Sequence, residues 1–92
     1  MAYNTSTHAK VRMQQRGISA RLVKNVIDYG STCRVPGGAV ARRVTRKDLK
    51  ELDELLPRKE LLDLDRHRGV YVVISNNDKV ITVGHRNTRF FE

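Results

Sequence analysis

The sequence is poor in cysteine, in aromatic residues and in long apolar runs. Of its 92 residues, only Cys33 is a cysteine, so no internal disulfide can form, and we expect a reducing compartment, the cytoplasm. Residues 1–7 lack the features of a signal peptide. The longest apolar run, Val70 to Ile74, is far too short to cross a bilayer. We therefore expect no role in a membrane.

Several classes of functional site are also missing. One cysteine and three scattered histidines do not make a four-ligand zinc site, and no glycine-rich phosphate-binding loop is present. The acidic residues lie mostly in the region after Thr45, where a third helix is predicted below, and they lack the spacing of a two-metal centre. We expect neither a metal nor a cofactor, so any chemistry would be acid–base chemistry by histidine, arginine and tyrosine.

Positive charge is what the sequence has in excess. Lysine and arginine total 18 against 10 acids, which gives a net charge of +8, and 12 of these cations are arginine. Arginine binds phosphate oxygens in pairs, and a cationic surface gains affinity for nucleic acid by releasing counterions. We expect a nucleic acid, RNA, as the partner. The alternative is that the basic composition has no specific purpose.

The length and the apolar pattern predict a single basic α+β domain over residues 1–92. Two short helices joined at Gly17 come first, and Thr45 to Asp48 has the spacing of a capping box that opens a third helix. Pro57 ends or kinks that helix and suits the start of a short one reaching about Leu64. The expected order is α-α-β-β-α-β-β, an antiparallel sheet with helices on one face. The third helical position stands for the helix after Thr45 and the short one from Pro57, and the other elements lie at residues 7–16, 20–29, 32–35, 39–44, 69–75 and 79–86.

The first predicted helix carries a polar stripe. His8, Arg12 and Arg16 are spaced four residues apart, so they share one side of the helix. Ala9 and Met13 form the neighbouring apolar stripe, which places His8 and Arg12 at the edge of the packed region. The stripe is either part of a binding site or a solvated face with a capping histidine.

The strands carry a second set of candidates. Because successive residues point to opposite faces, only one of Arg42 and Arg43 faces away from the helices. With a hairpin loop at Asn77-Asp78, we expect Ile81, Val83 and His85 on the face that the helices cover, with Val70, Val72 and Ile74. Tyr71, Thr82 and Arg86 then share the other face. A histidine at a strand end can equally be structural, and we interpret His67 as part of a solvated charged loop.

These residue types suit one reaction. RNA can be cleaved by its own 2′-hydroxyl when a base, an acid and cations surround the phosphate. We assign His8 and His85 to the acid–base roles as the catalytic candidates. The nucleic-acid-binding candidates are the following residues: Arg12, Arg16, Arg43, Arg86 and Tyr71.

Both ends of the chain carry a family resemblance. His8-Ala9-x-x-Arg12-Met13-Gln14-Gln15-Arg16-Gly17-Ile18 and Val80-Ile81-Thr82-Val83-Gly84-His85-Arg86 resemble the opening and closing motifs of a family of small bacterial proteins. That family is similar to the metal-independent RNase toxins that include RelE, barnase and colicin-type nucleases. The resemblance implies N-terminal helices packed on an antiparallel sheet. It gives no proven active site, because catalytic residues differ between branches of that group.

Three hypotheses about function follow. The first is a metal-independent endoribonuclease, a toxin restrained by an acidic antitoxin-like protein. The second is a non-catalytic module that binds RNA or DNA. The third is a protein-interaction domain whose charge serves an acidic protein partner.

Overall fold

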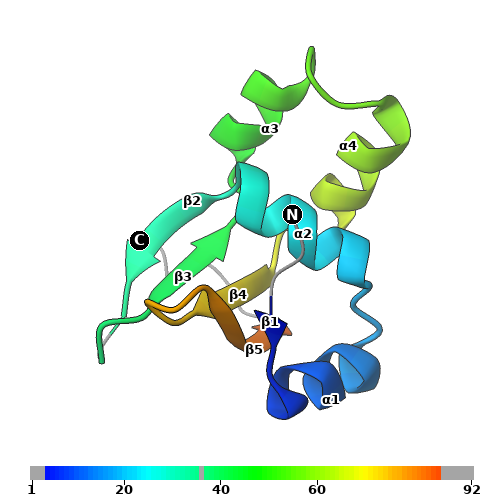
Figure 1. The fold of residues 1–92 in the computed structure, drawn as a ribbon. Helices are drawn as coiled ribbons and strands as arrows, with labels where there is room; N and C mark the ends of the chain where they lie inside the picture. Colours follow the sequence, from blue (N-terminus) through cyan, green and yellow to red (C-terminus); the bar gives the residue numbers. More distant parts are fainter. Residues whose placement is uncertain (1–3, 36, 86–92) are drawn as a thin grey trace.

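Pairs of helices and pairs of strands succeed one another along the chain after a first short strand, in a computed structural model that describes residues 4–35 and 37–85. The first two helices, α1 and α2, follow a two-residue strand, β1, and two further helices, α3 and α4, separate β3 from β4 (Figure 1). The elements are β1 (Asn4–Thr5), α1 (Thr7–Arg16), α2 (Ala20–Tyr29), β2 (Ser31–Arg34), β3 (Val40–Arg43), α3 (Arg46–Leu52), α4 (Arg58–Arg66), β4 (Val70–Ile74) and β5 (Lys79–His85). The α+β class is confirmed.

The sheet corrects the expected topology. It has five strands in the order β1-β5-β4-β3-β2, and β1 pairs in parallel with β5, Asn4 opposite Lys79 and Thr5 opposite Val80. The sheet is therefore mixed rather than antiparallel, and a strand precedes the first helix. β1 could not be predicted from the sequence, because two residues are too few to show the periodicity of a strand.

The two N-terminal helices begin at serine caps. The Ser6 hydroxyl accepts a hydrogen bond from the Ala9 amide at 3.0 Å, and the Ser19 hydroxyl accepts one from the Leu22 amide at 3.1 Å. Gly17 ends α1 with φ of 66°, a left-handed conformation that glycine adopts without strain. The backbone and side chain of Ser6 also donate to Val80 and Ile81 of β5. The start of α1 is thus fixed to the start of β5.

The core lies between the sheet and the helices. Ala9 of α1 and Leu22 and Val26 of α2 pack with Val72 and Val83 in one buried cluster. Each buried valine or leucine among them contributes about 1.5–3 kcal/mol to folding. A register irregularity between Val73 and Ile74 corrects one expected face. The core position opposite Ile74 is taken by Val80, which is fully buried, and Ile81 is only half-buried.

Two separate helices, α3 and α4, lie on either side of Pro57, as the sequence indicated, although the expected order counted them as one element. The predicted capping box is confirmed, because the Thr45 side chain accepts from the Asp48 amide at 3.1 Å and Asp48 accepts from the Thr45 amide at 2.9 Å. Pro57 is the N-cap of α4, since its fixed φ suits a helix start and it has no N–H to satisfy. The connection at Asp53–Pro57 lets α3 and α4 fold back on each other. We call residues 46–66 the α3–α4 hairpin.

Candidate nucleic-acid interface

The face of the sheet opposite the core brings two of the predicted binding residues together. Arg42 pairs with Val72 across β3 and β4, so one step along the strands Arg43 lies opposite Tyr71. Val72 is buried beneath the helices, and strand alternation turns its neighbours to the other face. Arg43 and Tyr71 are both half-buried. This pair, on adjacent strands, is the centre of the candidate interface.

Tyr71 is held in place by a glycine that sequence analysis did not single out. Tyr71 pairs with Gly84 of β5, and a Cβ at Gly84 would lie 2.9 Å from the Tyr71 hydroxyl oxygen and 3.1 Å from two of its ring carbons. The ring therefore lies across the bare backbone of Gly84. A residue with any side chain would push it away. The signal in the sequence was a glycine inside a predicted strand, which indicates a close approach.

Strand alternation separates the two neighbouring arginines into different roles. Arg42 is turned to the helix side, where its guanidinium donates to the Gly30 carbonyl at 2.7 Å and to the Thr32 hydroxyl at 2.6 Å. It thereby links the C-terminal end of α2 to the start of β2. Arg43 is the arginine directed to the face opposite the core.

The polar stripe of α1 lies apart from this pair. Ala9 is fully buried, and α1 packs against β5 on the core side of the sheet. His8 and Arg16 are exposed, and Arg12 is half-buried. No hydrogen bond within residues 4–35 and 37–85 links these side chains to Arg43 or Tyr71. The stripe therefore contributes positive charge to a second region of the surface.

The two histidines assigned to acid–base roles lie near opposite ends of β5. His8 is in the first turn of α1, whose cap residue bonds Val80 and Ile81, whereas His85 is the last residue of β5. Five residues of extended strand span about 17 Å. In the described part of the chain neither imidazole has a hydrogen-bonding partner. Cleavage by this pair stays a prediction, and Arg86 lies outside the described residues.

His67, the third histidine, contacts the end of its own helix. His67 is half-buried rather than solvated, with Nδ1 at 2.9 Å from the Asp63 carbonyl and 3.3 Å from its carboxylate. It closes the end of α4. Within the described ranges, no group of three histidine, cysteine or acidic side chains is arranged to hold a metal ion.

No helix among the described residues is long and apolar enough to cross a membrane.

Charge is divided between two parts of the molecule. The α3–α4 hairpin holds seven of the ten acids and six cations, whereas the rest of the chain holds 12 cations and only three acids. Figure 1 shows the hairpin on one side of α2 and α1 on the other side. The candidate interface belongs to the cationic part.

Comparison with known protein families gives one match. A family model described as a domain of unknown function, DUF4258, matches residues 5–85, and the chain therefore belongs to this family. No curated protein and no solved structure matches the chain. The match gives no support for a relationship to RelE or barnase.

Proposed function

We propose that this DUF4258 protein binds single-stranded RNA on the face of the sheet that carries Arg43 and Tyr71. The observation that supports the proposal is the position of an arginine beside a tyrosine on adjacent strands, with the ring laid over Gly84. Unstacked bases bind by stacking on aromatic rings, and phosphates bind to arginine. The two side chains supply one contact of each kind.

The distribution of charge favours this partner over an uncharged one. Outside the α3–α4 hairpin the chain carries a net charge of +9, and such a surface displaces the counterions condensed on a polyanion when it binds. An acidic antitoxin-like protein is the competing partner that the same charge would attract. A protein that covered Arg43 and Tyr71 would also block RNA.

The first prediction separates the two contacts by their salt dependence. Arg43→Ala should weaken RNA binding and lower the log–log salt slope by about 0.7, the contribution of one phosphate contact on a single strand. Tyr71→Ala should weaken binding by about 1–3 kcal/mol without changing the slope, because a stacked base releases no counterion. Fluorescence anisotropy titrations with a labelled single-stranded RNA at several salt concentrations measure both effects.

Arg58→Ala is the matched control, because it removes the same charge from an exposed position on α4. It should leave the affinity close to that of the wild type. Equal losses for Arg58→Ala and Arg43→Ala would mean that only net charge matters, and the proposed surface would be wrong. Absence of RNA binding at low salt would remove the function altogether.

A further inference from the structure

The α3–α4 hairpin contains more leucine than its own core uses. Seven of the eight leucines of the chain lie within residues 49–64. Leu52 and Leu64 of these are buried, and the partly buried Leu49, Leu56 and Leu61 pack against the core. Leu55 is 72% exposed and Leu62 is 47% exposed. Single exposed apolar residues are normal, but apolar residues gathered in one element indicate an interaction surface.

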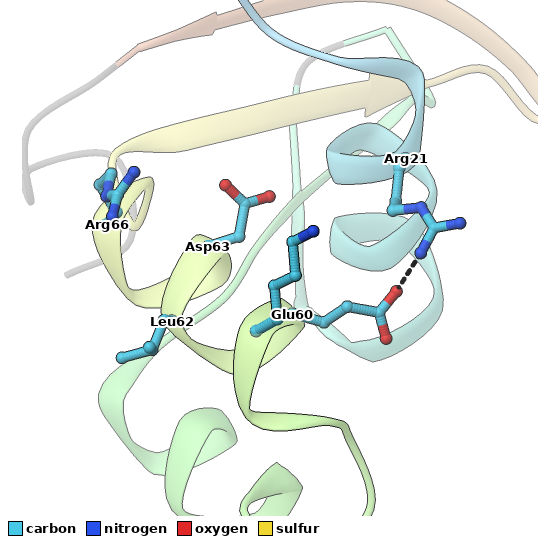
Figure 2. Close-up of a pocket in the computed structure, with 6 residues that line it drawn as sticks. Arg21, Glu60, Leu62, Asp63 and Arg66 are labelled. Atoms are coloured by element: carbon cyan, nitrogen blue, oxygen red, sulfur yellow. Dashed lines mark hydrogen bonds and ion pairs between the residues drawn. The ribbon is translucent and has the colours of Figure 1, made fainter.

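The outer side of α4 is shaped as a ridge between two hollows. One hollow lies between α2 and α4 and includes Arg21, Glu60 and Leu62 in its lining, and Figure 2 shows Arg21 reaching Glu60 on one side while Leu62 points to the other. The second hollow lies between α3 and α4. Its lining consists of Leu49, Leu61 and again Leu62, together with the charged residues Lys50, Asp53 and Asp65. Leu62 therefore stands between two depressions, the second of them largely apolar.

Charge indicates which partner can approach this surface. The hairpin has seven acids and six cations, a net charge of −1, while the remainder of the chain has a net charge of +9. Two copies of the protein repel each other when their cationic parts meet. Two hairpins can meet without that repulsion, and their mixed charges can pair across the contact. A hairpin placed on the cationic part of another copy would also avoid repulsion, but that head-to-tail contact would not close on itself and would build open chains rather than a dimer.

We propose that the hairpin is a homodimer interface, in which the α4 ridge of one copy enters the groove between α3 and α4 of a second copy. A two-fold contact uses the same patch on both subunits, so each copy contributes an exposed Leu62 and accepts the other's. Four helices then bury the leucines that one copy leaves exposed. The RNA-binding proposal is independent of this contact.

The second prediction is that the protein is a dimer whose stability depends on Leu62. Leu62→Glu, alone or with Leu55→Glu, should give a monomer, because a charge in an apolar contact is left without compensation. Val11→Glu is the matched control, since Val11 is an equally exposed apolar residue, 45%, on α1. It should remain dimeric. Sedimentation velocity over a range of protein concentrations measures the mass, and circular dichroism verifies that each variant folds.

A crosslink tests the two-fold geometry without altering charge. In a Cys33→Ser background, Leu62→Cys should oxidise to a disulfide-linked dimer, and Val11→Cys should stay monomeric under denaturing electrophoresis. A wild-type protein that is monomeric at every concentration would overturn the proposal. So would a dimer that Val11→Glu dissociates as well as Leu62→Glu does, because the contact would then lie elsewhere.

Discussion

At the scale of single residues, the pair of Tyr71 and Gly84 shows how a missing side chain can position a functional one. Two carbons of the Tyr71 ring lie 3.1 Å from where a Cβ of residue 84 would be, which is too close for that atom to be added without a shift. Stacking energy depends on the orientation of the ring, so a ring with a fixed support loses less freedom when a base binds. Gly84 would thus contribute to binding without touching RNA.

The third prediction follows from this support. Gly84→Ala should displace the Tyr71 ring, because the new methyl group would lie 2.9 Å from the hydroxyl oxygen. RNA affinity should then fall toward that of Tyr71→Ala, with the salt slope unchanged. The double variant should bind no more weakly than Tyr71→Ala alone, since two changes that remove the same contact are not additive. Additive losses in the anisotropy titrations would show that Gly84 acts in another way.

At the scale of secondary-structure elements, Asp48 connects the hairpin to the sheet. Its carboxylate accepts from the Thr45 amide at 2.9 Å, which caps α3, and from the Ser31 hydroxyl of β2 at 2.8 Å. One side chain therefore fixes both where α3 begins and how it meets the edge strand. The position of the α3–α4 hairpin depends on this carboxylate.

The fourth prediction concerns that connection. Asp48→Ala should destabilise the protein by about 1–2 kcal/mol, the typical cost of a lost cap with a part-buried donor left unpaired. Asp53→Ala removes an equal charge from the exposed end of α3 and should change stability much less. Urea denaturation followed by circular dichroism compares them. Similar midpoints for the two variants would contradict the assigned role.

The elements also show what the sequence could and could not predict. Helix caps at Ser19 and Thr45, the end of α1 at Gly17 and the alternation along β4 are local signals, and the structure follows them. The two-residue β1 exists only because β5 offers it an edge, and the irregularity beside Ile74 moved Val80 into the core. Alternation assigned Tyr71 to the face away from the helices and required one of Arg42 and Arg43 to face that way. Which arginine it is, and how near it lies to Tyr71, depends on the register of β3 and β4.

At the scale of the whole molecule, the proposed interface and the proposed RNA surface lie in different parts of the chain. The hairpin carries most of the acids and leucines, and the sheet with α1 carries the net positive charge. A dimer formed through two hairpins would leave both cationic parts accessible. Each dimer would then present two RNA-binding surfaces.

The fifth prediction rests on both proposals and compares RNA length. A strand long enough to reach both surfaces should bind the wild type more tightly than a short one, by on the order of 10²-fold when the geometry permits simultaneous contact. The gain should disappear in Leu62→Glu and persist in Val11→Glu, which carries the same added charge. The ratio of long-strand to short-strand affinity is the quantity to measure. A gain that survives in the monomeric variant would indicate that the length effect arises within one copy.

The pairing of β1 with β5 has a consequence for how the chain folds. The Ser6 hydroxyl donates to the carbonyl of Ile81, 75 residues later, and Ala9 is buried against strands that include β5. Contacts so distant in sequence form slowly, because a large loop must close before they contribute. During synthesis, α1 therefore has no sheet on which to dock until β5 has left the ribosome. Over that interval the apolar stripe of Ala9 and Met13 has no β5 to cover it, which is the kind of transient exposure that favours aggregation.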